Sequence, residues 1–152
     1  MSQIRIDAMA RSHATPDRIF ALLKDGSTWT RWAGFKHFEL EQTGQGEPYG
    51  VGAIRVFSTP LTRAREQIVE LTPDRRLSYV LLSGFPFRDY RADVDLEPVN
   101  GGTVIHWRSR FEAKQFGLGW FWRVFMTLVL NSVSTRLAMA AEHVRPPMAA
   151  ET

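Results

Sequence analysis

The sequence contains no cysteine, and this absence excludes several kinds of chemistry at once. Disulfide bridges, a cysteine nucleophile and thiolate-bound metal sites all need a thiol that the chain does not have. An excess of one charge is also missing, because 19 lysines and arginines stand against 16 aspartates and glutamates and form no basic block. Nucleic-acid binding depends on clustered cationic side chains, so it is not expected here.

The short motifs that mark metal, phosphate and acyl-transfer sites are absent as well. The 4 histidines fit neither an HxxxH nor an HExxH spacing, so we expect no metal site. The glycine-rich stretch 44–52 leads into a predicted strand rather than a helix, and it therefore offers no helix amino terminus to a phosphate. No G-x-S-x-G elbow occurs. We expect no cofactor, and no motif identifies a catalytic residue.

Long hydrophobic runs are few. The amino terminus carries charges throughout and lacks the apolar core of a signal peptide, which predicts a cytoplasmic protein. The most apolar stretch, residues 117–133, is interrupted by Arg123 and Asn131. A bilayer span needs about 20 mostly apolar residues. We therefore expect a long helix of a soluble fold here, and no transmembrane segment.

Alternation of polar and apolar residues predicts a chain built mainly of strands. A helix is expected over residues 17–24, with Thr15 as its N-cap and Pro16 at its first position, and a shorter helix over 28–32. Short turns, among them Asn100-Gly101-Gly102, favour an antiparallel arrangement of the strands. The predicted strands are residues 3–10, 36–42, 53–58, 64–71, 77–82, 90–97 and 103–111.

These elements predict one α+β domain over residues 1–145, followed by a flexible tail, residues 146–152. In the last two predicted strands, alternate positions carry charges, acidic at Asp93 and Asp95 and basic at Arg108 and Arg110. Opposite charges pair across neighbouring strands, so these positions define a solvent face. The other face contains Trp107 and needs a cover, which the long helix can provide.

The long helix has apolar residues on two sides. One side, expected to pack on the sheet, consists of Trp122, Met126, Val129, Val133, Leu137, Ala140 and Val144. The opposite side begins with a contiguous apolar group of Phe121, Val124, Phe125 and Leu128. Such a group usually marks an interface. Its cover can be the loop 84–88, a second copy in a homodimer, or the surface of a membrane.

Five segments resemble the polyketide cyclase/dehydrase and lipid-transport family of the START-like superfamily. ATPDRIFALLKDGSTWTRWAGF is similar to the helical entry segment of that family. VGAIRVF, AREQIVELTPDRRLSYVLLSG, RDYRADVDLEP and GGTVIHWRSRFEA are similar to its successive strands. The resemblance covers roughly residues 3–144. It implies a helix-grip fold, in which a curved seven-stranded antiparallel sheet, two short helices and a long C-terminal helix enclose a cavity for an apolar molecule.

A curved sheet under a single helix leaves a gap, typically about 300–1,000 Å³ and lined mainly by apolar groups. The alternative for each candidate lining residue is ordinary core packing. The candidates are Trp32, Phe38, Tyr79, Leu81, Phe87, Tyr90, Trp107, Phe111, Trp122 and Met126.

The polar candidates begin with Arg55 and Glu66, which lie on neighbouring predicted strands. They form either an inward ion pair that anchors a ligand oxygen or a cross-strand pair on the surface. Tyr79, Tyr90 and Ser109 are candidate hydrogen-bond donors to a ligand. For the cyclases of the family, the resemblance implies catalysis by an arginine with hydroxyl partners, here Arg55 and Tyr79, with Glu66 beside them.

Three functions follow as hypotheses. The leading one is an intracellular binding or carrier domain for a small hydrophobic molecule such as a lipid, a polyketide or an aromatic compound. The second is an enzyme similar to a polyketide cyclase or aromatase. The third is a protein-interaction domain that uses the outer face of the long helix and needs no sizeable cavity. Whether any reaction is catalysed stays open at this point.

Overall fold

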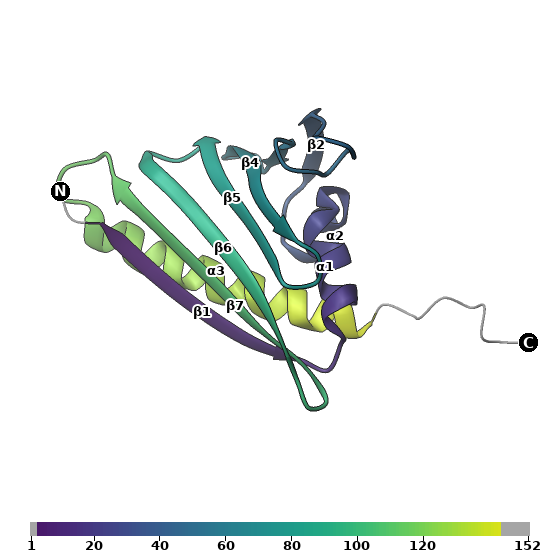
Figure 1. Ribbon diagram of the computed structural model, residues 1–152. Helices are drawn as coiled ribbons and strands as arrows, with labels where there is room; N and C mark the ends of the chain where they lie inside the picture. The colour runs from purple at the N-terminus through teal and green to yellow at the C-terminus, as the bar shows by residue number, and fades with distance from the viewer. Residues whose placement is uncertain (1–2, 144–152) are drawn as a thin grey trace, which may run out of the picture.

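The computed structural model describes residues 3–143, in which seven strands form a single antiparallel sheet (Figure 1). The strand order is β1-β7-β6-β5-β4-β3-β2, so the last strand pairs with the first and every other neighbour is also consecutive in sequence. The predicted fold class is thereby confirmed. The strands are β1 (Ile4–Ser12), β2 (His37–Gln42), β3 (Ile54–Ser58), β4 (Arg63–Thr72), β5 (Arg76–Ser83), β6 (Phe87–Val99) and β7 (Gly102–Ala113).

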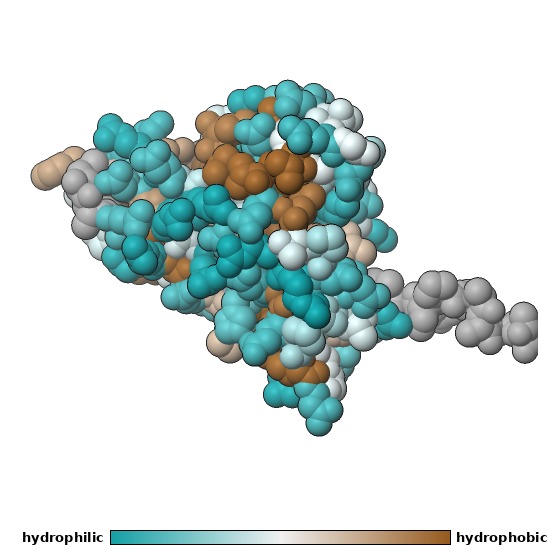
Figure 2. Space-filling view, viewed as in Figure 1, coloured by the Kyte–Doolittle hydropathy of each residue, from teal (hydrophilic) through white to brown (hydrophobic). Residues whose placement is uncertain are grey.

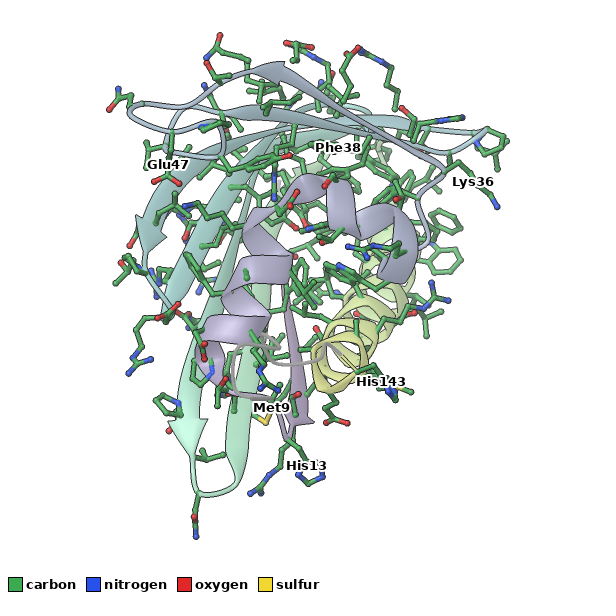
Figure 3. The ribbon with its side chains drawn as sticks, turned by 90° about the vertical axis from the view of Figure 1, so that its right-hand side faces the viewer. Met9, His13, Lys36, Phe38, Glu47 and His143 are labelled. Atoms are coloured by element: carbon green, nitrogen blue, oxygen red, sulfur yellow. The ribbon has the colours of Figure 1, made fainter. Side chains whose placement is uncertain are left out.

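Two short helices, α1 (Pro16–Lys24) and α2 (Trp29–Trp32), connect β1 to β2 through the 3-10 turn η1 (Gly26–Thr28). Pro16 stands at the start of α1, as predicted, where a missing backbone N–H costs no helical hydrogen bond. Figure 3 shows the curved sheet arching over α1 and α2. Phe38 of β2 lies so close to η1 that a Cβ on Gly26 would collide with its ring. Only glycine fits at that position.

The two faces of the sheet differ as the charge pattern predicts. Trp107 of β7 is buried on the inner face, whereas Asp93 of β6 lies opposite Arg108 of β7 on the outer face. On that face Asp95 accepts hydrogen bonds from Arg76 and Arg108. The outer face is mostly hydrophilic, as the view in Figure 2 shows. The inner face therefore supplies the core and any internal site.

Bulges interrupt the pairing of the sheet at several places. The register shifts between Arg65 and Glu66 and again between Ile68 and Glu70 in β4, and between Arg88 and Arg91 in β6. A bulge bends its strand and increases the local twist. These shifts curve the sheet over the helices, which leaves space between its inner face and the long helix.

The long helix α3 (Gly119–Glu142) runs along the inner face of the sheet, beside β1 and β7 (Figure 1). Its buried residues are Met126, Leu130, Ser134, Leu137, Ala138 and Ala141. By length and composition alone α3 could cross a membrane, and 33% of its most apolar 18-residue window is buried here.

The predicted packing side of α3 does pack on the core, with a shift in rotation. Met126 and Leu137 are buried. The other described members, Trp122, Val129, Val133 and Ala140, are half-buried and pack against the core. The most buried side is rotated toward Leu130, because apolar residues occupy most of the circumference of the first half of the helix and their spacing does not fix the rotation. Val144 and the predicted tail, residues 146–152, lie outside the described residues.

Candidate functional site

A cavity of about 320 Å³ lies between the inner face of the sheet and α3. Its walls come from α2 and the segment after it, from the turn between β3 and β4, from β4 to β7, and from α3. Among residues 3–143, Glu66 is the only charged residue in this wall. The lining residues are Trp29, Ala33, Gly34, Phe35, Thr59, Leu61, Thr62, Ala64, Glu66, Tyr79, Leu81, Phe85, Phe87, Tyr90, Trp107, Phe125, Met126, Val129, Leu130 and Val133.

Aromatic rings in mutual contact form much of the wall. Trp107 meets the ring of Trp29 edge-on, with 5.8 Å between the centroids, and meets Tyr79 edge-on at 6.5 Å. Phe87 stacks on Tyr90 at 5.9 Å. Edge-to-face and stacked pairs of this kind hold one another in fixed orientations. The wall is therefore preformed and suits a flat or elongated apolar molecule.

One ion pair lies at the side of this aromatic wall. Arg55 of β3 stands directly opposite Glu66 of β4, and its Nη2 is 3.7 Å from Glu66 Oε1. The Arg55 side chain is completely buried and that of Glu66 is 10% exposed. Burial of both partners excludes the alternative of a surface cross-strand pair.

Arg55 points toward α1 and is not part of the cavity wall. Its Nη1 donates hydrogen bonds to the carbonyl oxygens of Leu23 (2.8 Å) and Lys24 (3.2 Å) at the end of that helix. Cationic groups are favourable at a helix carboxyl end, where carbonyls lack partners. Its guanidinium carbon lies 4.9 Å from the centroid of Trp29, a cation–π contact. Arg55 thus fixes α1 and α2 to the sheet and holds Glu66 from behind.

Glu66 is the member of the pair that faces the cavity. Burial raises the pKa of Glu66 to about 7, against the opposing effect of the Arg55 charge. The same burial lowers the pKa of Arg55. Since an arginine starts from a very high pKa, Arg55 keeps its charge. Near neutral pH Glu66 can therefore both accept and donate a proton inside an apolar chamber.

Two tyrosines of the wall add hydroxyl groups. Trp107 Nε1 donates a hydrogen bond to the Tyr79 hydroxyl over 3.3 Å, which leaves the Tyr79 proton available to another acceptor. Burial raises the pKa of Tyr79 and of Tyr90 well above the ordinary tyrosine value. Both phenols consequently stay neutral and act as hydrogen-bond donors.

Several buried polar atoms near the cavity have no hydrogen-bond partner among the described residues. They are Nε and Nη2 of Arg55, Oε1 of Glu66 and Oγ of Ser109. A buried polar atom without a partner costs about 1–3 kcal/mol. Glu66 lines the cavity, so a ligand that donates a hydrogen bond to its carboxyl group would stabilise this buried group.

The structure brings seven of the predicted binding residues to the cavity wall, namely Glu66, Tyr79, Leu81, Phe87, Tyr90, Trp107 and Met126. Six others lie elsewhere: Trp32, Phe38, Arg55, Ser109, Phe111 and Trp122. Five of these six are occupied by packing or by another contact, and Ser109 is buried outside the wall.

Trp32 donates a hydrogen bond from Nε1 to Thr28 Oγ1 and borders a different, shallow depression. Phe38 packs on Phe57, with 5.3 Å between the ring centroids. Phe111 is completely buried, and its ring centroid lies 4.2 Å from that of Phe87.

Trp122 meets Phe87 edge-on at 5.0 Å, and its Nε1 donates to Gln115 Oε1. Ser109 is buried on β7 outside the cavity wall. The inward position of aromatic residues was thus predictable, whereas the division between wall and core was not.

Sequence reasoning missed lining residues that lie in turns. Phe35 follows α2, Leu61 lies in the turn between β3 and β4, and Phe85 lies in the turn before β6. Turn residues have no periodicity that would indicate an inward direction. The one available signal is the presence of a large apolar residue in an otherwise polar or proline-containing turn.

The predicted outer group of α3 is on the surface. Phe121, Val124, Phe125 and Leu128 are all exposed. The loop 84–88 contributes one contact, because the ring of Phe85 lies 6.4 Å from that of Phe125. Within residues 3–143, no group of three histidine or acidic side chains is placed to hold a metal ion.

The fold is START-like. Residues 3–143 match the model of the family described as polyketide cyclase/dehydrase and lipid transport. The chain belongs to that family. Among curated proteins, no sequence is significantly similar to this chain.

Several solved structures share the fold. A START superfamily protein from Mycobacterium smegmatis is 12% identical with a TM-score of 0.80, covering 93% of this chain and 99% of that one. The protein Ara h 8.0201 is 14% identical with a TM-score of 0.73, covering 92% and 98%. A protein from Chromobacterium violaceum is 16% identical with a TM-score of 0.68, covering 93% and 99%. At these identities the likeness concerns the fold alone.

Proposed function

We propose that this chain is a binding or carrier domain for a small hydrophobic molecule held between the sheet and α3. The observation that carries the proposal is the cavity of about 320 Å³, whose wall is apolar except for a few polar groups. A pocket of this size with few polar groups is typical of small-molecule sites. A domain that acted only through its outer surface would need no such cavity.

The polar groups favour a ligand with one polar end. The Glu66 carboxyl group and the side chains of Tyr79 and Tyr90 are the polar groups of the wall on β4, β5 and β6. Most of the remaining surface is aromatic or aliphatic. A neutral, mostly apolar molecule with a hydroxyl or keto group at one end matches this arrangement, with the hydroxyl or keto oxygen directed toward Glu66 and the tyrosines.

Native mass spectrometry of freshly purified protein tests the proposal directly. We expect an additional mass from a co-purified apolar compound. Val129→Trp, which fills the cavity from α3, should remove that mass. Val124→Trp is the matched control, because Val124 lies on the same helix but outside the cavity wall, and it should retain the compound. A clean mass without any bound compound, after expression in several hosts, would argue against the carrier function.

A second candidate is a cyclase-like enzyme, favoured by one observation. Glu66, with its pKa raised to about 7, borders the same cavity as the neutral Tyr79 hydroxyl. A carboxyl group with a pKa near the working pH is suited to general acid–base catalysis. In an assay with a poly-β-ketone substrate, Glu66→Gln should abolish turnover and Ser109→Ala should not. An unchanged rate in Glu66→Gln removes Glu66 from the mechanism.

A further inference from the structure

The first half of α3 exposes an apolar surface, which we call the α3 patch and define as Trp120, Phe121, Val124, Phe125 and Leu128. Trp120 is 68%, Leu128 66% and Val124 55% exposed. Large apolar side chains grouped in this way on a soluble domain usually mark an interaction surface.

The α3 patch continues into the mouth of the cavity. Phe125 belongs to the patch and also lines the cavity. Leu61, which is 94% exposed at the turn between β3 and β4, lines the cavity as well. Beside them, Leu128 and Val129 line a shallow depression of the surface. Whatever covers the α3 patch therefore also covers the entrance to the cavity.

The charged side chains that α3 carries before Glu142 are cationic. Between Gly119 and Ala141, Arg123 and Arg136 are the only charged residues. Arg136 and Arg31 of α2 line a depression together with Met139, next along the helix from the patch. Within residues 3–143 none of these three arginines forms an ion pair. The side combines an aromatic surface with uncompensated positive charge.

We propose that the α3 patch docks on the surface of a lipid bilayer that contains anionic headgroups. In this arrangement α3 lies along the interface, its aromatic side chains enter the boundary between headgroups and acyl chains, and Arg31 and Arg136 contact phosphates. Tryptophan favours that boundary, as Trp120 would here. The cavity then opens toward the apolar layer, from which a hydrophobic molecule can enter without crossing water.

Charge complementarity distinguishes this occupant from a second copy of the chain. A two-fold homodimer brings the same patch of both copies together. The described α3 residues before Glu142 offer arginines and no carboxylate, so self-association would find no opposite charge on the helix. An anionic membrane supplies that charge. The docking extends beyond the proposed carrier function and does not require a bound ligand.

Flotation with phosphatidylcholine vesicles, prepared with and without phosphatidylglycerol, tests the docking. We expect the protein to float with the vesicles that contain phosphatidylglycerol and to be released by salt. Phe121→Ser/Leu128→Ser should weaken binding by at least about tenfold, since each side chain loses favourable burial. The matched control is Met9→Ser, which removes a side chain that is 64% exposed on the outer face of β1. It should bind as the wild type does.

Charge variants separate the contribution of the lipid headgroups to binding from that of the apolar contact. Arg31→Gln/Arg136→Gln should reduce the preference for vesicles with phosphatidylglycerol, whereas Arg5→Gln on the outer face of β1 should not.

Absence of vesicle binding, or binding that Phe121→Ser/Leu128→Ser leaves unchanged, overturns the proposal. A dimer in sedimentation that this variant dissociates, without vesicle binding, identifies a second copy as the occupant and overturns it too. The Val129→Trp protein should lose the ligand and still float with the vesicles. The failure of the carrier function is therefore distinguishable from the failure of the membrane docking.

Discussion

The sheet carries cross-strand ion pairs on both faces, and the two sets behave differently. On the inner face, Arg55 and Glu66 stand alone in an apolar region, and the pKa of Glu66 rises to about 7. On the outer face, Asp95 binds Arg76 and Arg108 within a larger network in contact with water. The chemical groups are the same, and the strands are neighbours in both cases.

Solvent accounts for the difference. Water stabilises each charge of the outer network, so each ion pair there contributes little to the free energy of unfolding. Inside, both charges lose their hydration, and their mutual attraction compensates only in part. The inner pair can therefore gain stability by binding a proton or a ligand, whereas the outer network cannot. Three measurements test whether burial separates the inner pair from the outer network.

The largest expected effect is that of Arg55→Met. It leaves Glu66 without a counter-charge and the carbonyls of Leu23 and Lys24 without this donor. Breaking a buried pair in this way costs about 3–5 kcal/mol of the free energy of unfolding, measurable by urea denaturation at pH 8. At pH 5 the cost should be smaller, because Glu66 is then protonated and needs no counter-charge.

Arg65→Met is the matched control for this variant, because Arg65 pairs with Glu41 on the surface at 2.6 Å. It should cost less than about 1 kcal/mol. Equal losses for the two variants would contradict the distinction between the inner and the outer pairs.

The second prediction concerns pH. Because the pKa of Glu66 is raised to about 7 in the folded protein from an ordinary value of 4.5, the folded state holds its proton longer than the unfolded chain. This contribution to stability is complete below pH 4.5 and is lost as the pH rises through about 7. The loss amounts to at most about 3 kcal/mol.

Urea denaturation across this pH range measures the slope, and Glu66→Gln should flatten it. Asp93→Asn on the outer face is the comparison, and it should leave the decline between pH 4.5 and 7 in place. A wild-type stability that rises over the same range would refute the assignment of Glu66 as a group with a raised pKa.

The smallest effect is expected for Asp95→Asn. This variant weakens the contacts to Arg76 and Arg108, both at least one third exposed. The cost should be about 0.5–1 kcal/mol and should shrink in high salt, since solvent ions screen exposed pairs. A loss above about 2 kcal/mol that is insensitive to salt would show that the outer network is as effectively desolvated as the inner pair.

The sequence predicted the fold well because its local signals agree with one another. Alternation located all seven strands, and the pair Thr15-Pro16 located the start of α1. Strand ends were less certain. The prediction ended the first strand at residue 10, whereas β1 continues to Ser12, since pairing with β7 supports residues whose own pattern is weaker.

The site was predictable only in part. Arg55 and Glu66 were expected on neighbouring strands, and the structure places them directly opposite each other. The inward direction of Glu66 follows from its alternation with Ala64 and Ile68, which are buried as well. That Arg55 is directed toward α1 and not into the cavity depends on the position of the helix end, which has no signature in the local sequence around Arg55.

The order of strands and helices and the apolar inner face follow from the sequence alone, because they rest on periodicity and turn residues that act over a few positions. The family follows from the sequence too, through the match over residues 3–143. The size of the cavity, the wall residues contributed by turns and the orientation of α3 were decided only by the tertiary structure. For α3 the reason is physical: a helix apolar on several sides can pack in more than one rotation, and only the curved sheet beneath it selects one.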